Sequence, residues 1–183
     1  GGNSIYGIYN GNQYNKLSSI TINSVAGKKQ AIIGIQNNTS KFPYLINEGN
    51  ITLSNSGLAY VIGTMLADSE NSVIAHNTGN INIKGKGDLY GMVGASNNQG
   101  SIILDDESAQ KTGMYLGSMP FHFTSTGSNF NKLNNNGSIT IEKANGYAYG
   151  MHSNVNYWQK NNLSVTFSHA SCHGLTVRTA LLP

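Results

Sequence analysis

Two short motifs alternate along this chain of 183 residues, and their repetition restricts the fold more than any other feature of the sequence. The first has the form Ile-x-Ile and usually follows a glycine, as in SITI, GNITL, GNINI, GSIIL and GSITI, with LSVTF as a degenerate copy. The second is centred on a glycine: IYGI, IIGI, VIGT, LYGM, KTGM and AYGM. From the first isoleucine of motif one to the glycine of motif two the spacing is 14, 12, 10, 11 and 11 residues, whereas whole units span 21 to 37. A fixed structural core with variable loops explains this difference.

Each unit is predicted to form one turn of a parallel β-solenoid. In motif one, Ile139 and Ile141 point one way while Ser138 and Thr140 point the other, as in a strand. No stretch has a sustained apolar stripe of helical period, and the units are short for four-stranded propeller blades. We therefore expect an all-β chain that forms one β-solenoid of about six to seven rungs over residues 1–183, with an irregular or incomplete end at 168–183.

Stacked rungs predict which residues form the core, because each side chain in a solenoid contacts its counterparts one rung above and below. We expect this core to include the following residues: Ile51, Ile81, Ile102, Ile139, Met92, Met114 and Met151. Strict alternation also predicts that Tyr149 and Met151 share one face of their strand. The glycine between them would permit a tight bend or a close approach of the neighbouring sheet.

Composition excludes several classes of protein. Only 10% of residues are charged, and the lysines are spread along the chain, whereas nucleic-acid-binding surfaces cluster their basic residues. Asparagine, at 26 residues, suits many polar turns. The single cysteine excludes an intrachain disulfide, and no apolar run approaches the ~20 residues of a membrane span. The opening GGNSIYGIYN has no charged and apolar signal-peptide pattern, so we expect either a protein that is not exported or an internal fragment of one that is; the repeats favour the fragment.

The runs IYGIYN, NEGNITL, NTGNINI, NNQGSIIL, NNNGSITI and AYGM resemble the passenger domains of autotransporters, the exported proteins of type V secretion. The resemblance is to adhesin-like and vacuolating-toxin-like passengers, and covers about residues 4 to 167. It implies a right-handed parallel β-helix, cut from a longer passenger, that is displayed on a bacterial cell surface or secreted. It also implies an adhesin, toxin scaffold or spacer, with no enzymatic activity and no cofactor. A host-cell surface protein or glycan, or a second copy of the chain, would be the partner.

The main alternative to a non-enzymatic passenger is a polysaccharide hydrolase or lyase of the pectin-lyase type, which would use carboxylates. Asp105, Asp106 and Glu107 form an acidic cluster, and Asp105 and Glu142 each lie three residues past the first isoleucine of their unit. Carboxylates on adjacent rungs could bind calcium or act as acid and base. However, Lys84 has the same offset one rung earlier and Lys143 matches Asp106. We therefore favour stacked, solvated ion pairs over catalysis.

The stretch SHASCH places His169, Cys172 and His173 within five residues, which could bind zinc. No fourth ligand is evident, so we expect no metal site here. Instead, HGL is expected to stand where YGM stands in other units, with Leu175 pointing inward, and HGLTV could begin another strand.

Two stretches outside the motifs are candidates for a binding surface. MPFHF includes Phe121, His122 and Phe123 within the longest unit, and loops on rigid scaffolds often bind partners. NYWQK includes Tyr157 and the only tryptophan, Trp158, which could stack on a sugar or anchor a protein. Packing of these aromatic residues on the solenoid wall is the alternative for both stretches.

Overall fold

The computed structural model describes residues 4–9, 13–37, 45–66, 74–105, 110–117, 119, 132–144, 147–153, 158–169 and 176–178. These residues form strands that are arranged in three parallel sheets, which we name A, B and C. In order across the sheet, sheet A contains β1 (Ile5–Tyr9), β4 (Ala31–Asn37), β7 (Tyr60–Leu66), β10 (Leu89–Val93), β13 (Gln110–Leu116), β16 (Tyr147–Ser153) and β19 (Thr176–Arg178).

Sheets B and C have six strands each in the described part of the chain. Sheet B contains β2 (Gln13–Asn15), β5 (Leu45–Asn47), β8 (Ala75–Asn77), β11 (Ser96–Asn98), β14 (Lys132–Asn135) and β17 (Trp158–Asn161). Sheet C contains β3 (Ser19–Ser24), β6 (Asn50–Asn55), β9 (Asn80–Gly85), β12 (Ser101–Asp105), β15 (Ser138–Ala144) and β18 (Ser164–His169).

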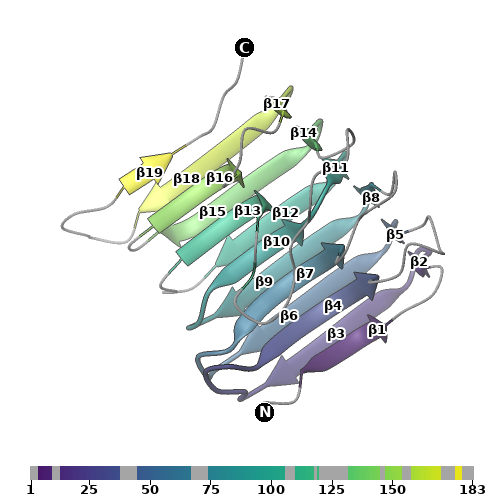
Figure 1. The fold of residues 1–183 in the computed structure, drawn as a ribbon, viewed down its shortest axis with the longest axis vertical. Helices are drawn as coiled ribbons and strands as arrows, with labels where there is room; N and C mark the ends of the chain where they lie inside the picture. The colour runs from purple at the N-terminus through teal and green to yellow at the C-terminus, as the bar shows by residue number, and fades with distance from the viewer. Residues whose placement is uncertain are drawn as a thin grey trace.

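Successive strands enter sheets A, B and C in turn, so that three strands make one rung of a parallel β-helix (Figure 1). Six complete rungs lie within the described residues, and β19 begins the next one by pairing with β16. The chain thus advances from one end of the stack to the other, with β1 at one edge of sheet A and β19 at the opposite edge. The predicted fold class, a single β-helix of about six to seven rungs, is confirmed.

The interior of the helix contains the residues that the repeat predicted. Ile51, Ile81, Ile102 and Ile139 stack in register along sheet C. Met92, Met114 and Met151 do the same along sheet A. All seven belong to one hydrophobic cluster and none is more than 1% exposed. Full burial of each such side chain stabilises the fold by about 1.5–3 kcal/mol, so these columns hold the three sheets together.

The glycine of motif two interrupts the alternation of sheet A. In β10, Leu89 and Met92 belong to the interior cluster, whereas Tyr90 belongs to a second cluster. A Cβ at Gly91 would lie 2.5 Å from Cγ2 of Ile102, so the glycine also faces the interior and allows sheet C to approach closely. Two consecutive inward positions shift the period by one residue, as in a β-bulge.

This shift corrects the prediction that Tyr149 and Met151 share a face. Met151 is buried in the interior, whereas Tyr149 is partly exposed and its ring stacks on His152 at 4.4 Å between centroids. The residue before the glycine therefore points outward and the residue after it points inward. The expected close approach of the neighbouring sheet at the glycine is confirmed.

The corner from sheet B to sheet C is built around a ladder of asparagines, which we call the asparagine corner. One asparagine ends each strand of sheet B, and each Nδ2 donates to the Oδ1 of the asparagine on the next rung at 2.7–2.8 Å. The members are Asn15, Asn47, Asn77, Asn98, Asn135 and Asn161. The four inner members are fully buried, so these side-chain hydrogen bonds satisfy polar groups that water cannot reach.

Glycine follows the asparagine by two residues at four of these corners. A Cβ at Gly79 would overlap the carbonyl oxygen of Gly49, and a Cβ at Gly100 would overlap that of Gly79. At these four corners a side chain in place of the glycine would collide with the adjacent rung. The asparagine and the glycine together therefore support the close spacing of the stack at these corners.

Sheet A is buried on both faces over its central strands. Its outward side chains contribute to the second hydrophobic cluster, together with Met119, which follows β13. The sheet A members are Ala31, Ile33, Ile62, Met65, Tyr90, Val93 and Tyr115, with Tyr6 and Tyr60 packed against the cluster. Every residue of β4 and of β10 is buried. Such continuous burial is typical of parallel strands that are covered on both sides.

The pairing of β19 with β16 corrects the predicted alignment of HGL with the YGM of other units. In β19, Thr176 pairs with Tyr147 and Arg178 pairs with Tyr149 of β16. His173 and Gly174 therefore do not occupy the positions of Tyr149 and Gly150, because the register places those positions five residues later. The expectation that HGLTV begins another strand agrees with β19, whereas residues 170–175 and 179–183 lie outside the described residues.

Candidate functional site

The predicted carboxylate pair lies on the outer face of sheet C, where Asp105 forms a ladder of opposite charges. Asp105 pairs in register with Lys84 of the preceding rung. Its Oδ2 lies 3.7 Å from the Nζ of Lys84, and its Oδ1 lies 3.6 Å from the Nζ of Lys143. The expected stacked ion pairs are therefore confirmed at Asp105. Both of its oxygens face ammonium groups, an arrangement that suits a structural role.

The other carboxylates of that prediction are Glu142, Asp106 and Glu107. Glu142 directly follows Ile141, which pairs with Leu104, so it lies one rung beyond Asp105 on the same sheet. It is partly exposed. Asp106 and Glu107 lie outside the described residues. The structure thus brings Asp105 to two lysines and places Glu142 on the adjacent rung.

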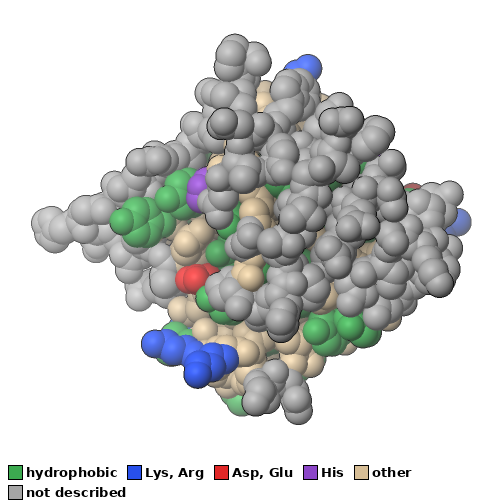
Figure 2. Space-filling model, in the orientation of Figure 1, with side chains coloured by type: hydrophobic (Ala, Val, Ile, Leu, Met, Phe, Trp, Pro, Cys, Tyr) green, Lys and Arg blue, Asp and Glu red, His purple; other side chains and the backbone are tan. Residues whose placement is uncertain are grey.

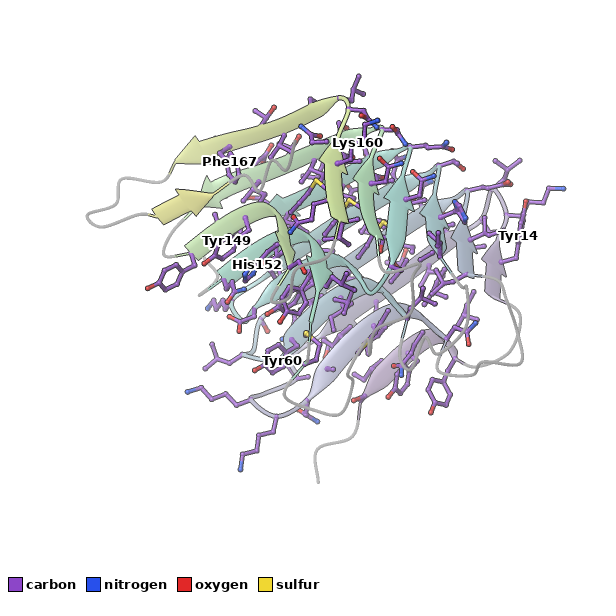
Figure 3. All side chains as sticks on the ribbon, turned by 45° about the horizontal axis from the view of Figure 1, so that its top comes forward. Tyr14, Tyr60, Tyr149, His152, Lys160 and Phe167 are labelled. Atoms are coloured by element: carbon purple, nitrogen blue, oxygen red, sulfur yellow. The ribbon has the colours of Figure 1, made fainter. Side chains whose placement is uncertain are left out.

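A row of aromatic rings, which we call the tyrosine face, runs along the outer side of sheet A. It consists of Tyr60, Tyr90, Tyr115, Tyr147, Tyr149 and His152. Ring centroids are 5.3 Å apart from Tyr90 to Tyr115 and 5.6 Å from Tyr115 to His152. Figure 3 shows Tyr149 and His152 beside each other on β16, with Tyr60 further along the same sheet. The rings thus connect neighbouring rungs on the outside, as the core does on the inside.

The tyrosine face is closed at its centre and open at one end. Tyr90 and Tyr115 are only 5% exposed, whereas Tyr147 is 57% exposed. The rings of Tyr147 and Tyr149 are nearly parallel, at 7°, and those of Tyr149 and His152 are at 17°. Figure 2 looks onto this side and shows hydrophobic, carboxylate and histidine side chains of the described residues together. Exposed parallel rings can stack on the flat face of a sugar or on a guanidinium group.

Asp88 introduces a carboxyl group at the edge of the tyrosine face. Burial raises its pKa, and a hydrogen bond from the Gln110 backbone opposes this rise. The pKa of Tyr60 is also raised, first by burial and then by the charge of Asp88. The same causes, in the same order, raise the pKa of Tyr90 strongly. Tyr60 and Tyr90 therefore remain neutral hydroxyl groups at physiological pH, available to donate or accept hydrogen bonds.

Lys111 is a fully buried lysine, which the sequence analysis did not identify. Its Nζ donates to the carbonyl oxygen of Lys143 at 3.1 Å. Lys143 has a φ of 51° and lies at an irregularity in the pairing of β15 with β18. The position two before the motif-two glycine holds Ile32, Val61, Leu89 and Ala148 in other units, and this apolar column was the available signal.

The aromatic candidates lie mostly outside the described residues. This holds for Phe121, His122, Phe123 and Tyr157. Of the same MPFHF stretch, Met119 is described and is buried in the second hydrophobic cluster. The backbone of Trp158 begins β17 and pairs with Lys132 of β14, so this residue belongs to a rung. The prediction of a binding surface at these residues therefore remains a prediction.

Neither a metal centre nor a membrane-spanning helix is found in the described part of the chain. No group of three or more His, Cys, Asp or Glu residues in it could hold a metal ion. Cys172 and His173 lie outside the described residues, and His169 ends β18. No helix in this part is long and apolar enough to cross a membrane.

Comparison of the chain with protein-family profiles, with curated proteins and with solved structures finds no match in any of the three.

Proposed function

We propose that the chain is a non-enzymatic segment of an exported bacterial passenger protein, in which the β-helix is a rigid scaffold for surfaces that recognise a partner. The observation on which this rests is the unbroken stack: the asparagine ladder and the interior columns continue through six rungs. Repeat units of very different length maintain the same register. A scaffold that keeps its core while its connections vary is well suited to present them.

Three further points support this proposal. The chain has one cysteine, so its stability comes from stacking and not from disulfides, which agrees with export in an unfolded state and folding rung by rung. The open end of the tyrosine face, with Tyr147 and Tyr149, offers a surface that could bind a glycan or a protein on a host cell. The sequence resemblance to autotransporter passengers points the same way.

Display on cells would test the proposal. The segment is placed between a secretion signal and an outer-membrane translocator in a Gram-negative host. We expect it to reach the cell surface in a protease-resistant form and to promote adhesion to epithelial cells. Two double substitutions, Tyr147→Ser with Tyr149→Ser on the tyrosine face and Phe121→Ser with Phe123→Ser in the MPFHF stretch, should reduce adhesion without reducing display. Failure to reach the surface folded, or adhesion equal to that of cells without the segment, would contradict the proposal.

An enzymatic assay addresses the polysaccharide hydrolase or lyase alternative. The purified chain is incubated with a panel of polysaccharides, and released reducing ends and unsaturated sugars are measured. We expect no release above background from the parent chain or from the Asp105→Asn/Glu142→Gln variant. Release that this double variant abolishes would establish catalysis by these carboxylates and refute the scaffold proposal.

A further inference from the structure

A groove of about 390 Å³ lies where sheet C turns towards sheet A on the first three rungs. Its lining comes from the ends of β3, β6 and β9 and the turns after them: Asn23, Ser24, Ser54, Asn55, Ser56, Lys84 and Lys86. Every side chain in this set is polar or cationic, and none is acidic. This volume is at the small end of the range for ligand sites and suits about one or two sugar rings.

Asn55 provides an acceptor that the described protein groups leave without a partner. The residue is only 4% exposed, and its Nδ2 donates to the carbonyl oxygen of Ala26 at 3.0 Å. Its Oδ1 is buried and receives no hydrogen bond from the described residues. A buried acceptor of this kind favours a ligand that brings a hydroxyl or amide donor, because an unpaired buried oxygen costs free energy.

The two lysines provide positive charge at the same groove. Lys86 is exposed and takes part in neither of the ion pairs found among the described residues. Lys84 contacts Asp105 at 3.7 Å, but its side chain is 67% exposed. Such a surface pair is weak, and Asp105 also has Lys143 as a second partner. Both ammonium groups can therefore approach an anion in the groove.

The hydroxyl groups of the lining are already partly ordered. Ser54 donates to Oδ1 of Asn23 at 2.6 Å, and Ser24 accepts from the backbone N–H of Ala26 at 3.1 Å. These bonds hold the wall in place on two adjacent rungs. A rigid wall of hydroxyl and amide groups loses little conformational entropy when a polar ligand binds.

We propose that this groove binds an acidic sugar unit, whose carboxylate or sulfate lies against Lys84 and Lys86 and whose hydroxyl groups pair with Asn55 and the serines. A neutral sugar would leave the lysines unused, and a simple inorganic anion would leave the Asn55 Oδ1 without a donor. The inference does not depend on export or adhesion, because the groove is a property of the folded rungs alone.

Calorimetric titration of the whole chain tests this inference with three probes of similar length. An oligogalacturonate carries carboxylates, a heparin-derived oligosaccharide carries sulfates, and a maltooligosaccharide is neutral. We expect at least one acidic probe to bind, more weakly as salt is added, and the neutral probe not to bind. The acidic probe that binds more tightly identifies the anionic group. Absence of binding by both acidic probes, or equal binding of the neutral one, would overturn the proposal.

Matched lysine variants locate the site. Lys84→Ala with Lys86→Ala should weaken binding of the acidic probe by about tenfold or more, the effect of losing charge-assisted hydrogen bonds. Lys16→Ala with Lys28→Ala removes the same charge from exposed lysines outside the groove and should change binding by less than about twofold. Circular dichroism would confirm that both variants fold. Equal losses in the two variants, or displacement of the sugar by inorganic sulfate at equal concentration, would refute a built sugar site.

Discussion

The two corners that flank sheet C follow opposite rules. At the asparagine corner the same side chain recurs on every rung, and each copy bonds to the next. We call the corner from sheet C to sheet A the variable corner. There, the residues that pair in register on the first three rungs differ: they are Ser24, Asn55 and Gly85. Identical side chains can bond to each other across rungs, whereas different ones leave space and unpaired groups. The asparagine corner therefore holds the stack together, whereas the variable corner contains the groove.

Among the substitutions that we consider, one in the hydrophobic interior between the sheets should lower the stability of the fold most. Met114→Asp places a carboxylate between Met92 and Met151 in the fully buried core. We expect it to lower the free energy of unfolding by more than ~3 kcal/mol, because an unpaired charge would be buried. Urea unfolding followed by circular dichroism measures this change. Glu142→Ala, on the partly exposed outer side, should cost less than ~0.5 kcal/mol, and equal tolerance at both sites would contradict the assigned register.

A pair of glycines on the third rung compares the two corners directly. Gly79→Ala at the asparagine corner would drive a methyl group into the carbonyl oxygen of Gly49, so we expect a loss of ~2–3 kcal/mol. At the variable corner, a methyl group at Gly85 would lie 3.1 Å from Cδ2 of Leu89, a flexible side chain, and 3.3 Å from the backbone oxygen of Asn55, so neither contact is as short as the overlap at Gly79. Gly85→Ala should therefore cost less than ~1 kcal/mol. Thermal unfolding of the two variants would contradict this comparison if Gly85→Ala were the less stable one.

The asparagine ladder itself can be broken at its centre. Asn77 accepts from Asn47 and donates to Asn98, each at 2.8 Å. Asn77→Ala therefore removes the ladder donor of the buried Asn98 Oδ1 and leaves the Nδ2 of Asn47 with its bond to the carbonyl oxygen of Gly49 alone. We expect a loss of about 2 kcal/mol in urea unfolding. Asn23→Ala at the variable corner removes only an exposed bond from Ser54 and should cost less than ~0.5 kcal/mol. A stack that tolerates both changes equally is not held by the ladder.

A smaller effect, visible only as a pH dependence, is expected at Asp88 beside the variable corner. Because burial raises the pKa of Asp88 above its ordinary value of 3.8, the native state favours the protonated carboxyl. The contribution of the Asp88 carboxyl to the stability of the parent chain is therefore fully present below pH 3.8. This contribution is lost as the pH rises through the raised pKa. Asp88→Asn should therefore be more stable than the parent at neutral pH, and the difference should vanish in acid. Unfolding curves measured across this pH range test the prediction. A difference in stability between Asp88→Asn and the parent chain that does not change with pH would contradict it.

The repeat predicts the parts of the fold that depend on identical contacts. Ile81, Ile102 and Met114 were predicted as core residues because their neighbours in the alignment are their neighbours in space. The asparagine ladder was missed although Asn-x-Gly precedes motif one in four units, because the pattern is equally typical of exposed turns. The outward position of Tyr149 was missed because alternation does not reveal that Gly150 shifts the period.

The remaining features depend on contacts that the repeat does not determine. Lys111 has an apolar position in the alignment, and the alignment does not show that its buried ammonium group donates to the carbonyl oxygen of Lys143. The groove needs Asn55 from one rung and Lys86 from the next, and no spacing in the sequence relates their side chains. Cross-rung neighbours of unlike type can be predicted only after the register is known.

Disulfide trapping of the register tests the central claim most directly. Thr52 pairs with Asn82 on the outer side of sheet C, and adjacent parallel strands are ~4.8 Å apart, within reach of a disulfide. In a Cys172→Ser background, Thr52→Cys with Asn82→Cys should oxidise to an intrachain disulfide in the folded monomer. Thr52→Cys with Lys84→Cys, displaced by two residues along the strand, should remain reduced because the Cα separation exceeds the ~7 Å limit. Oxidation of the displaced pair in preference to the in-register pair would show that the rungs do not stack as described.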